Sequence, residues 1–426
     1  MEISVKKSKI SGQVEIPGSK SHTIRAILIA SLAGGTSTIK MPLVSEDTIA
    51  CLSAASVLGA WIKRGDDSIW RISGTGGHLL QPAGTINMGN SGTGLRFFTA
   101  LAAIADFKVS FDGDSSLRTR EMASLLEALA AMGAKTGSAD GKCPLSVTGP
   151  IDGKDILVDG KTSQFLSALL LTAPLLKNDT VIHVSKLNER PYVMLTLDWL
   201  DREGIRYEMD KNLIRFKVFG GQKYVPFSTR IPVDFSTAAF PLLAAAITGG
   251  DVKIPNLDFD DSQGDKAVFG YFSQMGVKIS TDNHITTIRG PKRLKPFDLD
   301  LNATPDALPV LAVAGACAEG VSYLRNVPQA RIKETDRIGC MASELRKMGV
   351  AVEELSDGMV VTGGKLKGSS DLSSFKDHRI AMALSIAGLA AEGETIVRDS
   401  DCAAITYPSF VEDFKRMGAN FMEMTI

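Results

Sequence analysis

The sequence predicts an α/β (α+β) protein of two domains, because one pattern recurs six times along its 426 residues. In each repeat a short polar segment opens an Ala/Leu-rich, helix-like run, which ends in small residues before a strand-like segment. A second, amphipathic helix pattern follows and closes at a glycine. These glycines recur about every 72 residues and are Gly59, Gly133, Gly204, Gly276, Gly349 and Gly418.

The six repeats divide naturally into three plus three. A chain of this length exceeds what one hydrophobic core normally holds, so two domains are expected. We predict an N-terminal domain over 19–231 and a C-terminal domain over 232–426. Residues 1–18 are expected to form an extra strand, with VEI at 14–16 in extended conformation, that joins the C-terminal domain.

The polar openings stand where helix N-termini are expected. They are G18-SKSHTIR, G89-NSGTGLR, K161-TSQFLSA, V233-DFSTAAF, A303-TPDALPV and K376-DHRIAMA. The strands predicted after or between them include KVSFDG (108–113), TVIHV (180–184), VKIPNL (252–257) and TIVRD (395–399). If the six openings are equivalent, six sets of free backbone N–H groups become available, and such helix ends bind anions.

Composition excludes several classes of function. Hydrophobic content of 44%, charged content of 22% and a net charge of −1 are typical of a soluble enzyme and argue against binding to nucleic acid or an anionic membrane. The apolar runs are too short to span a bilayer, and MEISVKKSKISG lacks the apolar core of a secretory signal. The five cysteines show no CxxC pair and the five histidines no metal-ligand spacing. We therefore expect a cytoplasmic monomer without a metal or other cofactor.

Cations at the openings are the unusual feature. The helix dipole disfavours positive charge at an N-terminus, so a bound anion is the natural compensation. Several such cations together predict a ligand set with two or three negative charges. The residues are Lys20, Arg25, Arg96, Arg120, Arg337 and Arg379.

Other polar residues at the openings have a structural interpretation. Ser91, Asp234, Ser236, Thr237 and Thr304 are interpreted as helix N-caps. His378 alone would be structural, but its position beside Arg379 favours a functional role. The GNSGTG segment lacks the spacing and the GK[ST] ending of a nucleotide-binding P-loop.

Seven short motifs mark the repeats. They are GSKS-x3-R at 18–25, GN-x-GT-x2-R at 89–96, SQFL-x-ALL at 163–170, RPY at 190–192, PDA at 305–307, KETDR at 333–337 and DHR-x-AM at 377–382. In this order and spacing, over nearly the whole chain, they resemble the 3-phosphoshikimate 1-carboxyvinyltransferase (EPSP synthase) family. The combination of GSKS, KETDR and DHR is highly specific, whereas the glycine segment alone would not be.

The resemblance implies a fold and an activity. The fold is two domains, each of three βαβαββ repeats, in the inside-out α/β barrel arrangement of enolpyruvyl transferases, with the active site in the interdomain cleft. The activity is transfer of the enolpyruvyl group of phosphoenolpyruvate to the 5-hydroxyl of shikimate 3-phosphate, releasing phosphate, on the shikimate pathway to chorismate and aromatic amino acids. No metal is implied, and glyphosate would bind on the phosphoenolpyruvate side.

The motifs also carry binding roles, residue by residue. Residues implied to contact or shape the phosphoenolpyruvate site are Lys20, Gly92, Arg96, Arg120, Gln164, Arg337 and Arg379. Residues implied to hold shikimate 3-phosphate, mainly from the N-terminal domain, are Lys20, Ser21, Arg25, Thr162, Ser163, Gln164, Tyr192, Asp306, Gln329 and Lys333.

The reaction needs a base for the hydroxyl, an acid for the methylene carbon and cations for the phosphate and carboxylate charge. Asp306 is the best candidate for the base, since neighbouring cations would lower its pKa and keep it ionised. Glu334 and Lys20 are both candidates for proton donation and return. The sequence leaves open which of them protonates the carbon.

Three positions depart from the family pattern. Glu189 stands two residues before Pro191 where the family commonly has Ser, beside the implied phosphate; it must turn away, pair with Arg190 or mark a changed substrate. Ile405 stands where many members have Lys, at the expected start of the sixth repeat's second helix. Phe97 replaces a Pro that frequently follows Arg96, a change expected to shift that helix.

Two alternatives remain. The first is a related enolpyruvyl transferase with a different acceptor, such as UDP-N-acetylglucosamine; that group typically has Lys-Asn in place of Lys20–Ser21 and a cysteine in the segment 112–121, which has none. The second is a non-catalytic, anion-binding homologue, which Glu189 and Ile405 favour. The presence of Lys20 and Asp306 favours an enzyme.

Overall fold

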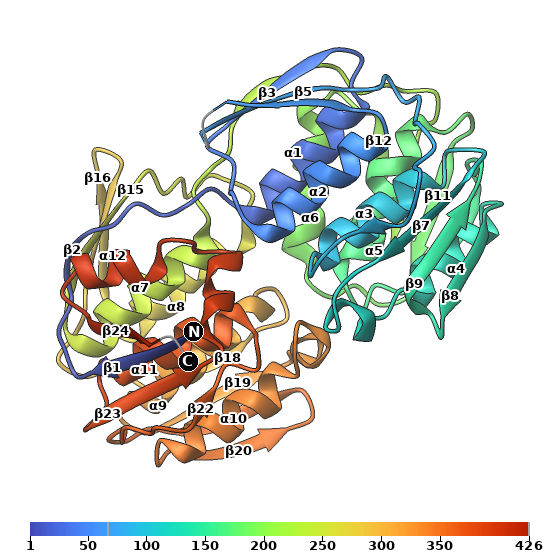
Figure 1. The fold of residues 1–426 in the computed structure, drawn as a ribbon. Coiled ribbons are helices and arrows are strands. Elements are labelled where there is room, and N and C mark those ends of the chain that lie inside the picture. Colours follow the sequence, from blue (N-terminus) through green and yellow to red (C-terminus); the bar gives the residue numbers. More distant parts are fainter. Residues whose placement is uncertain (66–67, 425–426) are drawn as a thin grey trace. The chain divides into compact units, whose positions relative to one another are not determined.

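The computed structural model describes residues 1–65 and 68–424, which divide into two compact units (Figure 1). The N-terminal unit comprises Gly18–Ile231, and the C-terminal unit combines Met1–Pro17 with Pro232–Ile426. Each unit has its own cluster of buried apolar side chains.

Over the described residues, both units are built from four-stranded sheets of a single design, three in each unit. The first and second strands of a sheet are parallel, and the fourth pairs antiparallel with both the second and the third. A helix precedes the second strand and another helix links the second to the third, which gives the βαβαββ repeat. In three sheets of the described residues one strand comes from elsewhere in the chain: β14 (Ser228–Arg230) and β2 (Ser11–Gln13) serve as first strands, and β1 (Glu2–Lys6) serves as a fourth strand. The predicted repeat is therefore confirmed.

The sheets of the N-terminal unit share the order first, second, fourth, third. They are β14 (Ser228–Arg230), β3 (Thr36–Lys40), β5 (Ile69–Ser73) and β4 (Trp61–Arg64); β6 (Ile86–Asn87), β7 (Lys108–Asp112), β9 (Lys142–Thr148) and β8 (Lys135–Ala139); and β10 (Asp155–Val158), β11 (Thr180–Val184), β13 (Arg215–Val218) and β12 (Tyr207–Met209).

The sheets of the C-terminal unit follow the same order. They are β2 (Ser11–Gln13), β15 (Asp251–Pro255), β17 (Ile285–Arg289) and β16 (Lys278–Asp282); β18 (Asp298–Asp300), β19 (Val321–Arg325), β21 (Gly358–Thr362) and β20 (Ala351–Leu355); and β22 (Leu372–Ser373), β23 (Glu394–Arg398), β1 (Glu2–Lys6) and β24 (Asn420–Met424).

Residues 1–17 contribute two strands to the C-terminal unit. β1 pairs with β23 and β24, and β2 pairs in parallel with β15. The strand predicted at 14–16 is wrong, because β2 spans Ser11–Gln13. Beyond Gln13 the pairing continues only through the bond from the Val14 N–H to Lys253 O, and Pro17 has no N–H to extend it.

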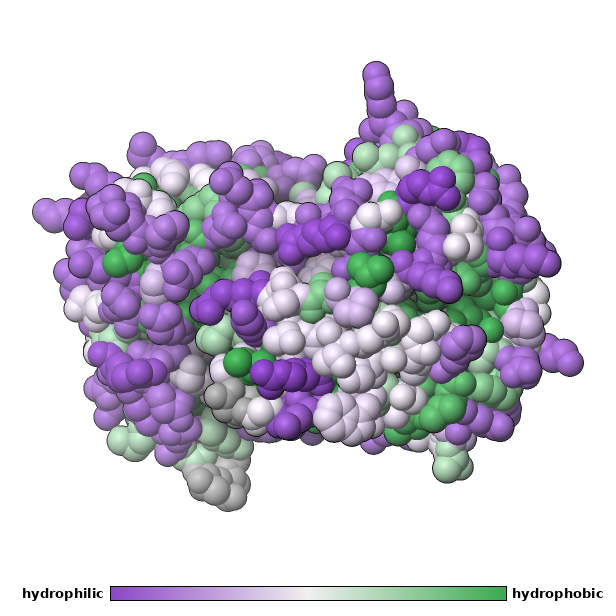
Figure 2. Space-filling model, turned by 90° about the horizontal axis from the view of Figure 1, so that it is seen from above, coloured by the Kyte–Doolittle hydropathy of each residue, from purple (hydrophilic) through white to green (hydrophobic). Residues whose placement is uncertain are grey.

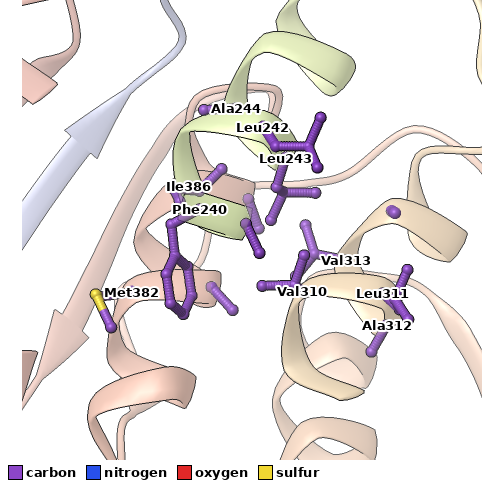
Figure 3. Packing of buried hydrophobic residues seen from close by; sticks show 14 of the residues in the cluster. Phe240, Leu242, Leu243, Ala244, Val310, Leu311, Ala312, Val313, Met382 and Ile386 are labelled. Carbon is purple, nitrogen blue, oxygen red and sulfur yellow. The ribbon is translucent and has the colours of Figure 1, made fainter. Parts of the chain in front are cut away.

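The first helix of each repeat is enclosed by its own unit. These helices are α1 (Lys20–Leu32), α3 (Gly92–Ala102) and α5 (Ser163–Thr172) in the N-terminal unit, and α7 (Phe235–Thr248), α9 (Leu308–Ala316) and α11 (His378–Gly388) in the C-terminal unit. α3 packs against α1 and α5, and α7, α9 and α11 pack against one another. Figure 3 shows Phe240 of α7, Val310 of α9 and Met382 of α11 in this core. Burial on all sides explains their nearly uninterrupted apolar sequences.

The second helices end at the predicted glycines. They are α2 (Glu46–Val57), α4 (Ala123–Ala131), α6 (Arg190–Arg202), α8 (Ala267–Gln274), α10 (Arg337–Lys347) and α12 (Phe410–Arg416). The glycine after each has a φ between 66° and 117°, which side chains strongly disfavour. The predicted helix endings are confirmed. The predicted start of α12 at Ile405–Pro408 is wrong, because those residues end one short helix and begin the turn before the next.

Short 3₁₀ helices connect several of these elements. They are η1 (Leu117–Thr119), η2 (Ala173–Leu175), η3 (Gly264–Lys266), η4 (Pro305–Ala307), η5 (Pro328–Ile332) and η6 (Ser400–Ile405).

On the face drawn in Figure 2, hydrophilic residues predominate and hydrophobic residues are scattered. Among residues 1–65 and 68–424, no helix is long and apolar enough to cross a membrane and no cluster of potential metal ligands occurs.

Candidate active site

The first helices of the N-terminal unit begin at hydroxyl caps. Ser19, Ser91 and Thr162 precede α1, α3 and α5, and their side-chain oxygens accept bonds from backbone N–H groups of the first turn. Such caps satisfy one of the free N–H groups of each helix and leave others available. The capping role predicted for Ser91 is confirmed.

Lys20 is the first residue of α1 and is paired with an acid. Its Nζ donates to Asp47 Oδ2 at 3.1 Å, and Asp47 is 5% exposed in the first turn of α2. Asp47 was not among the predicted site residues. The helix dipole stabilises an acidic residue in the first turn whether or not that residue also pairs with a lysine. The presence of Asp47 at this position therefore did not predict its pairing with Lys20.

Arg25 lies in the second turn of α1 and is 2% exposed. Its guanidinium donates to Thr196 Oγ1 at 3.0 and 2.8 Å and to the carbonyls of Ser21 at 3.0 Å and Tyr192 at 3.1 Å. The Phe97 ring lies 5.2 Å from it, and α3 continues through Phe97. All these partners are neutral, and burial lowers the pKa of Arg25 to about 9. An anion would compensate this charge.

Arg96 and Arg120 converge beside Gly92. Arg96 Nη1 donates to Gln164 Oε1, and Arg120 Nη2 donates to Asn90 Oδ1. A Cβ at Gly92 would lie 2.6 Å from Arg120 Nη1 and 3.1 Å from Arg96 Nη1. The missing side chain therefore lets two guanidinium groups approach the start of α3.

Not all the predicted cations occupy helix N-termini. Lys20, Arg337 and Arg379 do, but Arg25 and Arg96 lie in the second turns of α1 and α3, and Arg120 follows η1. The dipole acts mainly on the first turn. Burial, more than the dipole, is what makes the last three positions costly for a charge.

Glu189 points into its own unit, toward the start of α5. Its Oε2 accepts from Ser163 Oγ at 2.7 Å, from the Ser163 N–H at 3.2 Å and from Thr162 Oγ1 at 3.4 Å. The residue is 1% exposed, so it does not turn away into solvent. Its carboxylate thus contacts two residues that the family resemblance assigns to shikimate 3-phosphate.

Asp306 is the centre of the charged cluster in the C-terminal unit. It lies in η4, and its carboxylate is 2.8 Å from Arg337 Nη1, 3.1 Å from Arg379 Nη2 and 3.8 Å from Lys333 Nζ. Burial alone would raise the pKa of Asp306, but the three cations outweigh it and hold this pKa well below its usual range. The predicted direction of the shift is confirmed.

Arg337, the first residue of α10, is 1% exposed and bound by three carboxylates. Besides Asp306, Glu334 Oε2 lies 2.6 Å from its Nη2, and Asp377 Oδ2 lies 2.7 Å from its Nε. Burial opposes the charge, yet the carboxylates raise the pKa of Arg337 above its ordinary value. Asp377 also caps α11 by accepting from the Arg379 N–H at 2.9 Å.

Arg379 links this cluster to α7. Its Nη2 donates to Ser236 Oγ at 2.9 Å, and Ser236 donates to Asp234 Oδ1 at 2.6 Å. Asp234 caps α7 by accepting from the Thr237 N–H at 2.8 Å, as predicted. The capping roles predicted for Ser236 and Thr237 are wrong, because Ser236 is a partner of Arg379 and Thr237 lies inside α7. Thr304 is the N-cap residue of η4, as predicted, but its side chain makes no cap bond.

The remaining predicted residues lie nearby in the same unit. Gln329 is buried in η5, which packs against η4, and its Nε2 donates to Asn302 O at 2.9 Å. His378, 1% exposed, is the first residue of α11. Ile405 ends η6, which packs against α11, and is partly buried.

The repeat design is the fold of solved enolpyruvyl transferases. An EPSP synthase structure from Acinetobacter baumannii superposes with a TM-score of 0.84 at 29% identity, covering 99% of each chain. The enolpyruvyl transferase NikO from Streptomyces tendae shares the fold, with a TM-score of 0.81 at 19% identity over 100% of this chain and 99% of its own.

The family follows from sequence comparison. The family model for EPSP synthase (3-phosphoshikimate 1-carboxyvinyltransferase) matches residues 5–414. A 3-phosphoshikimate 1-carboxyvinyltransferase of Acetivibrio thermocellus is 46% identical over 99% of both chains, and one of Methanosarcina acetivorans is 41% identical over 100% of both. The chain belongs to the EPSP synthase family.

Proposed function

We propose that this chain transfers the enolpyruvyl group of phosphoenolpyruvate to the 5-hydroxyl of shikimate 3-phosphate and releases phosphate, as its family implies. The observation that carries the proposal is Asp306, a carboxylate that Lys333, Arg337 and Arg379 keep ionised. It can accept a proton from a hydroxyl, and the same cations can bind the anionic donor.

Each unit carries its own set of proposed binding residues. In the N-terminal unit, Ser21, Arg25, Thr162, Ser163 and Tyr192 are proposed for shikimate 3-phosphate, and Lys20, Arg96, Arg120 and Gln164 for phosphoenolpyruvate. In the C-terminal unit, Gln329 and Lys333 are proposed for shikimate 3-phosphate, and Arg337 and Arg379 for phosphoenolpyruvate. Buried Arg25 and Arg120, whose partners are neutral oxygens, support anion binding in the N-terminal unit.

The reaction proceeds in two steps. Asp306 takes the hydroxyl proton as the oxygen bonds to C2 of phosphoenolpyruvate, while the methylene carbon gains a proton and becomes a methyl group. The tetrahedral intermediate then loses phosphate, which takes up the proton from Asp306 as its C–O bond breaks, and the methyl group returns its proton to the group that supplied it. Glu334 and Lys20 remain the two candidates for this second proton.

Donor binding would also change the basicity of Asp306. In the cluster, Arg337 and Arg379 both contact its carboxylate, which makes it a weak base. An anionic donor that draws on the same guanidinium groups would weaken these pairs and raise the pKa of Asp306. Proton removal would then follow donor binding.

The second candidate function is enolpyruvyl transfer to a different acceptor. Glu189 favours it, because its carboxylate contacts Ser163 and Thr162, where the acceptor phosphate is expected. In either case we propose a cytoplasmic monomer with small-molecule partners; light scattering of the purified chain tests the oligomeric state.

Phosphate release tests the proposal. Purified protein should release phosphate only when both shikimate 3-phosphate and phosphoenolpyruvate are present. Asp306→Asn should lower kcat by about a thousandfold while the protein stays folded, and Asp306→Ala should likewise be inactive. Asp298→Asn, which loses only an exposed pair with Arg325, is the matched control. Release with another phosphorylated acceptor but not with this one would show that the acceptor is wrong.

A further inference from the structure

Glu189 places a negative charge where the proposed function needs a bound phosphate. Its Oε2 takes bonds from the Ser163 N–H and from the hydroxyls of Ser163 and Thr162 at the start of α5. A backbone N–H in the first turn of a helix, flanked by hydroxyls, is what a phosphate oxygen would bind. The chain thus carries its own anion at this position.

The local structure holds Glu189 there. Its φ of 56° and ψ of 39° are left-handed, a conformation uncommon outside glycine and asparagine. The preceding residue, Asn188, is buried and anchored: its N–H bonds Gly160 O at 2.9 Å and its Nδ2 bonds Lys161 O at 3.3 Å. The two loops before α5 and α6 are therefore joined, and the carboxylate lies between them.

The acceptor phosphate and this carboxylate cannot share the same donors without a penalty. Two like charges in direct contact repel, and the repulsion is strong where water is excluded. Ser163 is 2% exposed and Thr162 8%, so little solvent screens the pair. Phosphate binding requires the carboxylate to leave Ser163 or to lose its charge.

We propose that Glu189 is a specificity-determining residue that competes with the acceptor's phosphate for the start of α5. It lowers the affinity for a phosphorylated acceptor and leaves the affinity for the unphosphorylated ring nearly unchanged. The wild-type chain therefore distinguishes shikimate 3-phosphate from shikimate less strongly than a variant without the Glu189 charge would. This inference rests on the proposed function, since that function places a phosphate here.

Two substitutions separate charge from packing. Glu189→Gln keeps the size and one acceptor oxygen but removes the charge, and Glu189→Ser also shortens the side chain. Glu127→Gln is the matched control, because it removes one carboxylate from an exposed position of α4 in the same unit. Binding of shikimate 3-phosphate and of shikimate to the full chain is measured by calorimetry, with thermal unfolding as the check of folding.

Both Glu189 variants should bind shikimate 3-phosphate at least about tenfold more tightly than the wild type. Their affinity for shikimate should change less than about twofold, and Glu127→Gln should behave as the wild type. Folded variants with unchanged or weaker binding of shikimate 3-phosphate would overturn the proposal, because Glu189 would then be structural only. So would equal gains for both ligands.

Wild-type protein alone gives a second test that does not depend on the variants' folding. The phosphate should add less than about tenfold to the affinity for the ring. A hundredfold preference, or no binding of either ligand to any form, would refute competition at this position. Phosphate release is assayed separately: failure of wild-type turnover counts against the proposed function, while the affinity ratios still decide the role of Glu189.

Discussion

The buried arginines of the two units differ in what holds them. In the N-terminal unit, Arg25 and Arg120 are held by carbonyl, amide and hydroxyl oxygens, and within the described ranges neither pairs with a carboxylate. In the C-terminal unit, Arg337 and Arg379 are held by carboxylates, with Asp306 common to both.

This difference separates two functions that one reaction needs. A buried charge with neutral partners keeps a large desolvation cost, which a ligand anion can offset on binding. A buried charge among carboxylates is already compensated, so its cluster is stable without ligand and fixes the position of a base. The N-terminal unit is thus suited to binding anions, and the C-terminal unit to holding Asp306 ionised.

The largest expected effect comes from removing one arginine in each unit. Arg337→Met leaves Asp306, Glu334 and Asp377 without their shared cation, and an uncompensated buried charge costs about 3–5 kcal/mol. We expect its thermal midpoint to fall by about 10 °C. Arg25→Met removes a charge that no carboxylate compensates, so its midpoint should fall by less than about 4 °C. Calorimetry of both variants would contradict the comparison if the two shifts were equal.

The next effect tests how closely the arginines of the N-terminal unit are placed. Gly92→Ala would bring a methyl group within 2.6 Å of Arg120 Nη1, so this guanidinium must move. We expect the KM for phosphoenolpyruvate to rise about tenfold, with a much smaller change for the acceptor. Gly270→Ala, whose added carbon meets nothing within 4 Å, is the control. An unchanged KM would mean that Arg120 does not hold the donor.

A pH titration addresses Arg25 alone. Because burial lowers the pKa of this cation to about 9, the ligand-free protein loses the charge as the pH rises through that value. Acceptor affinity should therefore be complete below pH 8 and fall about fourfold between pH 8 and 9.5. Calorimetric binding across this range checks it, and the residual binding of Arg25→Gln should lack this component. A flat profile in the wild type would show that an anion is not held by Arg25.

Local signals in the sequence predicted most of the fold. A hydroxyl cap, an apolar run and a closing glycine are contiguous, so α3 and the glycine after α4 could be predicted from neighbouring residues. The error at 14–16 has the opposite cause: Val14 and Ile16 are buried as strand residues would be, but β2 ends at Gln13 and only the Val14 N–H continues its pairing. Buried and exposed side chains alternate over 14–16 although these residues form no strand.

The partners within the site were less predictable, because they lie far apart in the chain. Asp47 is 27 residues from Lys20, and Asp377 is 40 residues from Arg337. Nothing in the sequence near either acid distinguishes pairing from helix capping. The direction of Glu189 likewise depends on a left-handed backbone angle, and the sequence left open whether it turns away, pairs with Arg190 or marks a changed substrate.

The smallest expected effect would make the C-terminal unit more like the N-terminal one. Ile405 ends η6, which packs against α11, the helix that carries Arg379. Ile405→Lys adds a cation to the element packed against α11, whose Arg379 already has a carboxylate partner, and the position is partly exposed, so screening limits the gain. We expect phosphoenolpyruvate to bind about two- to threefold more tightly, measured by calorimetry with Ile405→Met as the uncharged control. Unchanged or weaker binding would mean that this residue does not face the donor phosphate. Buried cations without carboxylate partners would then be a property of the N-terminal unit alone.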